Sequence, residues 1–353
     1  MQPRLDILAG PHALRVLRAR GLRAEDVDMV AAASGGPKWI VLHGLDRALL
    51  TGLLATSQRS IPVVGSSSGA WRMACWAQRD PLAALDRMAE AYIGQRYPAR
   101  PSLALVSRTC AGIVSHLLGE HGAGDILAAQ RFRLHVLTAA CHGLTASDAR
   151  LPLLTGLVMA SVCNAAHRRA LGWFMERVIF GVPHAENAFA HLRDLPTRHV
   201  AMGAGHVAPA LLATGSIPLL AEAVDIADAP AGRYRDGALT DYHPAFDFGQ
   251  GEGVVLYPHF FSHLIPGWLD RFAPGRRPTL RNLDRVVLIA PSKAFVASLP
   301  GGKIPDRNDF YTLSDDARIA RWEAVRDASA ALGDELNALI ASGRIVERVR
   351  PLT

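Results

Sequence analysis

The feature that most constrains the fold of this chain is a five-residue turn, Gly65-Ser66-Ser67-Ser68-Gly69. An apolar run at 61–64 precedes it and predicts a buried strand, and residues 70–78 have helical spacing. A G-x-S-x-G between a strand and a helix is typical of a nucleophile elbow, where the flanking glycines permit a sharp turn that exposes the serine hydroxyl. We therefore predict Ser67 as a nucleophile. The alternative is a flexible Ser/Gly loop.

A second glycine turn, Ser34-Gly35-Gly36-Pro37-Lys38, follows the apolar run 27–33. Backbone N–H groups at a glycine loop that opens a helix can point at a developing oxyanion. The pattern fits neither the dinucleotide-binding nor the P-loop motif, so nucleotide binding is not indicated. An ordinary strand-to-helix turn is the alternative interpretation.

Together, the first 80 residues predict a strand–loop–helix unit that occurs twice, which indicates an α/β fold with a parallel sheet. We expect one domain, 1–353, of three layers: a mainly parallel central sheet flanked by helices, with helical insertions. Its motif-bearing core is about 27–258, and Ser314 caps a last helix at about 315–342. Further strands are predicted at 133–139, 253–257 and 285–289, and further helices at 4–21, 39–54, 81–92, 110–118, 151–166, 167–180 and 209–213.

The composition narrows the class of protein. Half of the 353 residues are hydrophobic and 20% are charged, which excludes disorder. The net charge of +6 is spread along the chain, so it favours no nucleic-acid partner but would suit peripheral contact with an anionic membrane surface. The aromatic-rich stretch 260–272 predicts core packing, with a lipid-contacting lip as the alternative.

The sequence carries no clear targeting, membrane-spanning or metal-binding motif. The first ten residues carry no secretory apolar region, and no uninterrupted apolar window reaches transmembrane length, so we expect a soluble cytoplasmic protein. The best apolar candidate, 151–166, contains Asn164 and predicts a buried helix. The four cysteines form no C-x-x-C pair and the histidines form no H-E-x-x-H motif, so neither a metal nor a cofactor is expected.

A third motif, Asp236-Gly237-Ala238, gains meaning beside the first two. In this order the three motifs resemble the patatin-like phospholipase family, and the segment 213–218 resembles that family's A-S-x-x-x-P segment. The resemblance covers roughly 28–244. It implies a lipid acyl hydrolase with a Ser–Asp dyad, in which Ser67 is the nucleophile and Asp236 the base. It further implies an oxyanion hole formed by backbone N–H groups at Gly35, Gly36, Lys38 and Ser68, with Gly65, Gly69 and Gly237 as motif glycines.

This chain departs from the family pattern in the oxyanion loop. Ser34 replaces the first glycine, Lys38 the usual arginine and Trp39 the last glycine, while Pro37 has no N–H to donate. Trp39 is expected to narrow the pocket. These departures leave open a catalytically inactive binding protein on the same scaffold. A Ser-His-Asp esterase is the other alternative, since three histidines (His243, His259 and His263) follow Asp236.

Overall fold

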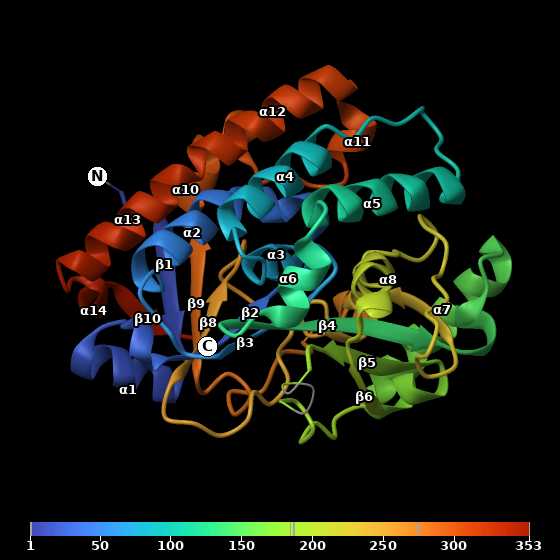
Figure 1. Ribbon diagram of the computed structural model, residues 1–353, viewed down its shortest axis with the longest axis horizontal. Coiled ribbons are helices and arrows are strands. Elements are labelled where there is room, and N and C mark those ends of the chain that lie inside the picture. The colour runs from blue at the N-terminus through green and yellow to red at the C-terminus, as the bar shows by residue number, and fades with distance from the viewer. Residues whose placement is uncertain (1, 184, 186–187, 274, 353) are drawn as a thin grey trace.

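The computed structural model describes residues 2–183, 185, 188–273 and 275–352, and it is an α/β structure built on one large sheet (Figure 1). The described residues form ten strands in the order β10-β1-β9-β8-β2-β3-β4-β5-β6, with β7 paired to β4. Most neighbouring strands are parallel; β1 with β9, β4 with β5 and β4 with β7 are antiparallel. The bounds are β1 Leu5–Ala9, β2 Val27–Ala32, β3 Ile61–Ser66, β4 Phe132–Cys141, β5 Met175–Gly181, β6 Thr197–Ala201, β7 Arg233–Asp236, β8 Val254–Pro258, β9 Val286–Pro291 and β10 Val349–Pro351.

Helices pack on this sheet, which is consistent with the expected three-layer architecture. In Figure 1, α1 lies below the strands and α2 to α5 lie above them. The bounds are α1 Pro11–Arg20, α2 His43–Ala48, α3 Ser68–Trp76, α4 Pro81–Ile93, α5 Leu103–Leu118, α6 Gly122–Ala128, α7 Arg150–Ala166, α8 Ala204–Thr214, α9 Ala238–Asp241, α10 Lys293–Ser298, α11 Asp309–Thr312, α12 Asp315–Ala328, α13 Ala330–Ala341 and α14 Ile345–Arg348. Short helical turns are η1 Ala24–Asp26, η2 Gly36–Leu42, η3 Leu49–Leu53, η4 Gly143–Ala146, η5 Arg168–Trp173, η6 Trp268–Phe272 and η7 Pro300–Gly302.

The central strands are apolar on both faces because helices cover both sides of a mainly parallel sheet. Strands β4, β8 and β9 are buried along their whole length. Continuous apolar runs of this kind were visible in the sequence, and the predictions for β2, β3, β4, β8 and β9 are confirmed within a few residues. The parallel pairing of β2 with β3 confirms the predicted β–α–β unit.

Two predicted helices are wrong where a strand pairs with the sheet. The segment 4–21 begins as β1, whose residues are alternately buried, and only Pro11 starts the helix. The segment 167–180 splits into η5 and β5, because Val178, Ile179 and Phe180 lie in an antiparallel pair with β4. Tertiary pairing outweighs the helical spacing in both places.

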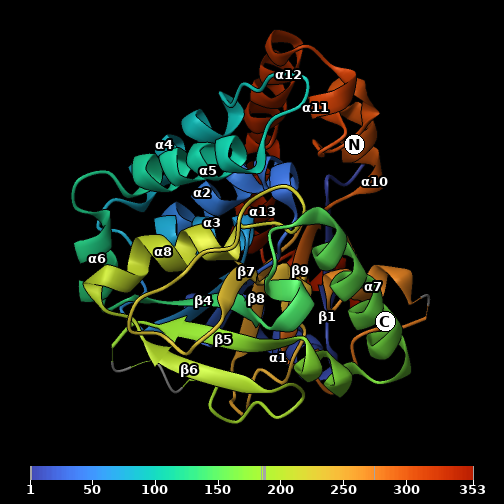
Figure 2. The same cartoon turned by 90° about the vertical axis from the view of Figure 1, so that its right-hand side faces the viewer.

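Two further helix predictions need correction. The last helix breaks at Ser329 into α12 and α13, where the Ser329 hydroxyl accepts the Gly44 N–H at 2.8 Å and donates to the Arg326 carbonyl. Helix α7, predicted to be buried, exposes Leu151, Val158 and Val162. Its other face packs against η4, η5 and η6 (Figure 2).

Candidate active site

The sheet register brings three distant motifs to one edge. Ala32, the last residue of β2, pairs with Gly65 of β3, so the loops that follow these parallel strands are neighbours. On β4, Leu137 pairs with Ser66 and Thr138 pairs with Asp236. We expected the Asp-Gly pair to place Asp236 on a loop after the strands, but Asp236 instead ends strand β7.

Ser67 has the backbone of a nucleophile elbow. Its φ is 52° and its ψ is −133°, a conformation that a non-glycine residue rarely adopts and that is held by its surroundings. The Ser67 amide donates to Thr214 Oγ1 at 2.8 Å, and that hydroxyl donates to the Leu137 carbonyl. Thr214 lies in the segment 213–218, which resembles the family's A-S-x-x-x-P segment, but nothing in the sequence indicated this role.

Two glycines allow the close approach of the elements around the elbow. A Cβ on Gly69 would lie 2.6 Å from the carbonyl oxygens of Ala32 and Ala33, so only glycine lets α3 cross the end of β2. A Cβ on Gly237 would lie 2.1 Å from the Leu137 oxygen. These glycines set the distance between the elbow and the strand end that carries Asp236.

Ser67 and Asp236 are in direct contact. Ser67 Oγ donates to Asp236 Oδ2 at 2.9 Å, and both residues are buried. The other carboxylate oxygen, Oδ1, accepts the Ala238 N–H at 2.8 Å. Burial raises the pKa of Asp236 to about 6, against the opposing effects of the Ala238 and Ser67 hydrogen bonds and the positive charge of Arg307. A carboxylate with this raised pKa is a better proton acceptor than an ordinary one.

The strand that carries Asp236 is anchored by its neighbour Arg235. This buried guanidinium donates to the carbonyl oxygens of Thr145 and Ser147 and forms an ion pair with Asp148 at 2.7 Å. Successive side chains of a β-strand point to opposite faces of the sheet, so anchoring Arg235 on one face fixes the position of Asp236 on the other.

The glycine loop after β2 lies across the same cavity. Gly36 has φ 54° and is the first residue of η2, and Ser68 is the first residue of α3. Amide N–H groups at these positions have no acceptor within their own helix, so both suit an oxyanion. Lys38 is less suitable than predicted, because its amide donates to the Gly35 carbonyl at 3.3 Å.

Gly35 supports this loop from behind. A Cβ there would lie 2.5 Å from the Phe260 ring, and the Ser34 amide donates to the Tyr242 carbonyl at 2.9 Å. In the stretch 260–272, Phe260, Leu264 and Leu269 are buried, as core packing predicts, whereas Phe272 is exposed.

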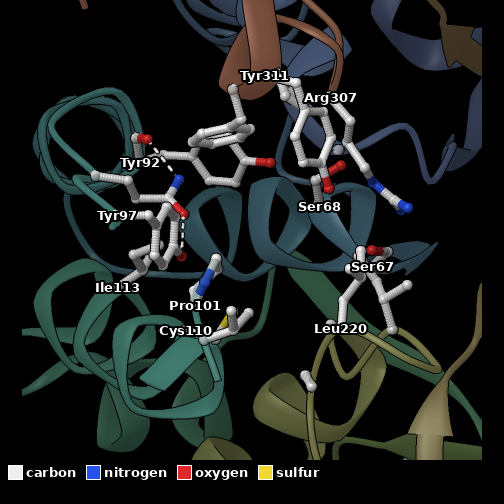
Figure 3. A pocket seen from close by; sticks show the side chains of 18 of the residues that line it. Ser67, Ser68, Tyr92, Tyr97, Pro101, Cys110, Ile113, Leu220, Arg307 and Tyr311 are labelled. Carbon is white, nitrogen blue, oxygen red and sulfur yellow. Dashed lines mark hydrogen bonds between the residues drawn. The ribbon is translucent and has the colours of Figure 1, made fainter. Parts of the chain in front are cut away.

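The cavity in front of Ser67 has mainly apolar walls (Figure 3). Gly36, Pro37, Ser67 and Ser68 line one side. The other walls come from α3, α4, α5, the segment 97–101, the segment after α8 and the region around α11, and they include Trp71, Tyr92, Val106, Cys110, Ile113, Ile217 and Leu220. Trp39 does not line it; this buried ring packs edge-on against Tyr92, with ring centroids 5.6 Å apart. The prediction that Trp39 itself narrows the pocket is therefore wrong; the ring contacts Tyr92, which lines the cavity.

Besides Asp315, which pairs with Arg318, the cavity is lined by a charged side chain that sequence reasoning missed, Arg307. Figure 3 shows it reaching toward Ser67 from the segment before α11. Among the described residues its guanidinium has no ion-pair partner. Its charge also acts on Lys38, whose pKa is lowered to about 8 mainly by burial. No sequence pattern marks a lone arginine of this kind.

The histidines that follow Asp236 lie elsewhere. His243 and His259 are buried beside Phe260, and no hydrogen bond joins any of the three predicted histidines to Ser67 or Asp236 in the described part of the chain. The His243 Nδ1 accepts the Ile265 N–H, and burial lowers the pKa of His259 to about 3. These rings pack behind the glycine loop.

Asp241, which follows the dyad motif, has a structural role. It accepts two hydrogen bonds from Arg177, each 2.7 Å long, and its carbonyl accepts the Ser66 hydroxyl. A second buried ion pair, Arg72 with Asp46, ties α3 to α2.

The chain matches no protein-family model, and no curated protein sequence is significantly similar to it. Within the described residues, no cluster of three or more His, Cys, Asp or Glu side chains could hold a metal ion. No described helix has the length and hydropathy of a membrane span.

Proposed function

We propose that this protein hydrolyses carboxylic esters of lipids through an acyl-enzyme on Ser67, with Asp236 as the base. The observation that carries the proposal is the 2.9 Å hydrogen bond between Ser67 Oγ and Asp236 Oδ2, made by a serine at φ 52° and a buried carboxylate. The resemblance of the motifs to patatin-like phospholipases supports the same reaction.

In this mechanism Asp236 removes the proton of Ser67 Oγ as the oxygen attacks the ester carbonyl carbon. The N–H groups of Gly36 and Ser68 stabilise the tetrahedral oxyanion, where each donor contributes about 3 kcal/mol. Protonated Asp236 then gives its proton to the departing alcohol. Water repeats the sequence on the acyl-enzyme, and the carboxylic acid leaves with Ser67 restored.

The cavity suggests the substrate class. Its apolar walls suit an acyl chain, and Arg307 places an unpaired positive charge near the reacting serine. A guanidinium binds phosphate well because it can form two parallel hydrogen bonds. We therefore propose an ester that carries an apolar chain and an anionic group, as a phospholipid or lysophospholipid does.

Fluorophosphonate labelling tests the reaction. The wild-type protein is expected to label at Ser67, identified by mass spectrometry of the modified peptide, and to hydrolyse p-nitrophenyl esters. Ser67→Ala should lose both properties, while Ser115→Ala, at an exposed serine of α5, should keep them. Turnover of phosphatidylglycerol compared with a neutral diacylglycerol, in wild type and Arg307→Gln, tests the substrate class.

Labelling of the wild type and replacement of the three histidines together decide between the alternatives. A folded wild type that neither labels nor hydrolyses esters would favour an inactive binding protein, a reading motivated by Pro37 and the occupied Lys38 amide. A Ser-His-Asp enzyme would instead lose activity on replacement of His243, His259 or His263, which the dyad mechanism does not require.

A further inference from the structure

Helix α7 presents an apolar face to the outside of the molecule. Leu151, Leu154, Val158, Met159 and Val162 are all exposed, Leu151 by 76% and Val162 by 66%. Their spacing, mostly three and four residues, places them on one stripe, called the α7 face below, about 17 Å long. A helix that is apolar on both its inner and its outer side normally has a partner on each.

Two exposed aromatic side chains extend the α7 face. Trp173 ends η5, is 77% exposed, and belongs to the turn that directly follows α7. Phe272 ends η6, is 65% exposed, and packs edge-on against Trp268. Both turns pack against the inner side of α7, so these exposed rings lie near the helix. Exposed apolar patches of this kind mark a surface for a protein or a membrane.

The surroundings of the α7 face are basic. Residues 149–175 contain three arginines, and residues 271–283 contain four, with no Asp or Glu in either segment. Arg276 donates to the Ala165 carbonyl at the end of α7, which places 276–277 beside the helix. Asp270 is buried and paired with Arg168 and Arg276. Asp148 and Glu176, which flank the first segment, pair with Arg233 and Arg198. An apolar stripe with a cationic border complements an anionic bilayer.

We propose that the α7 face, with Trp173 and Phe272, docks this protein onto an anionic phospholipid membrane. The helix would lie along the interface, since its inner side packs on the protein. A second copy fits less well, because a two-fold contact through this face would place arginines against arginines. This proposal goes beyond the proposed hydrolysis and does not depend on it.

The α7 face is also linked to the cavity of Ser67. Leu219 packs against the apolar cluster that contains Leu153 and Leu157 of α7. Its neighbours in the same segment, Ile217 and Leu220, line the cavity. Docking through α7 would therefore bring a bilayer close to the segment 217–220, which forms one wall of the cavity.

Vesicle co-sedimentation of the full-length protein tests the proposal. Binding is expected to vesicles of phosphatidylcholine mixed with phosphatidylglycerol, and to weaken with added salt. The double variant Leu151→Gln, Val162→Gln should bind the vesicles at least about tenfold more weakly, because both substituted side chains lose apolar contact with lipid. Since both side chains are exposed, thermal unfolding should show an unchanged fold.

A matched pair of charge variants tests the basic border. Arg169→Gln with Arg277→Gln should weaken binding to the anionic vesicles, whereas Arg15→Gln with Arg18→Gln on α1, at the same net charge, should not. Equal binding by all variants, or no sedimentation of the wild type, would overturn the proposal. So would a dimer in analytical ultracentrifugation that the apolar double variant abolishes, since it would assign the face to a second copy.

Discussion

Replacing Asp236 with Asn is expected to stabilise the folded protein at neutral pH while abolishing turnover. The carboxylate is buried, and its hydrogen bonds from Ser67 and Ala238 do not fully replace lost hydration. Burial raises its pKa to about 6, against the opposing effects of those bonds and Arg307. Asn has the same shape without the charge, so it removes this cost.

The sign and size of this stability difference follow from the linkage between folding and protonation of Asp236. Because the pKa of Asp236 is higher in the folded chain, its protonated form favours folding below about pH 3.8, and this contribution is lost as the pH rises through about 6. One pKa unit corresponds to about 1.4 kcal/mol, so the free energy of unfolding that is lost between these pH values is about 3 kcal/mol. Asp236→Asn should therefore exceed wild type in stability by up to about 3 kcal/mol at pH 7.5, and by little at pH 4.

Urea unfolding at pH 4, 6 and 7.5 measures the difference. Asp194→Asn is the control of opposite sign: partial burial opposes the effect, but the hydrogen bonds and charge of Arg177 lower the pKa of Asp194 to about 2. That variant should be less stable than wild type at pH 7.5, with a gap that closes as the pH falls toward 2. An Asp236→Asn protein that is equally or less stable than wild type at pH 7.5 would refute the reasoning.

Three further predictions concern the same site. The kcat/KM of ester hydrolysis should fall about tenfold per pH unit below about pH 6. Because the charge of Arg307 lowers the pKa of Asp236, Arg307→Gln should shift this acidic limb of the pH–rate profile to higher pH, and an unshifted limb would contradict the prediction. Thr214→Val leaves the Ser67 amide and the Leu137 carbonyl unpaired and should cost about 1–3 kcal/mol for each in urea unfolding, with Thr214→Ser close to wild type. Gly69→Ala should lose about 1–3 kcal/mol or more to its backbone clash, whereas Gly112→Ala, which meets nothing within 4 Å, should lose none.

Local sequence signals predicted the elements that carry the site. The apolar runs before Gly35 and Gly65 mark buried parallel strands, and both positions are strand-to-helix turns in the structure. The contact between Ser67 and Asp236 also agrees with the residues expected to act together. These signals work because strand burial and glycine turns are encoded by residues close in sequence.

The remaining features depend on contacts between distant residues. The strand that delivers Asp236 has only four residues, of which two are arginines, so its pattern does not indicate a buried strand. Arg235 is buried because carbonyl oxygens from 145 and 147 surround it, a fact that no local pattern contains. The exposed face of α7 was missed for the same reason, since an apolar helix gives no local sign of which side the protein covers.

Ser67 and Asp236 are separated by 169 positions in the chain and meet because both flank β4. Closing a loop of that length costs entropy that is recovered only when β3, β4 and β7 have joined, so their pairing belongs to the late, non-local part of folding. A nascent chain in which β7 has not yet been synthesised contains Ser67 but lacks Asp236, the proposed base. Under the proposed mechanism, the Ser67 hydroxyl is not activated until the sheet is assembled, and turnover regained during refolding would report completion of the sheet rather than early collapse.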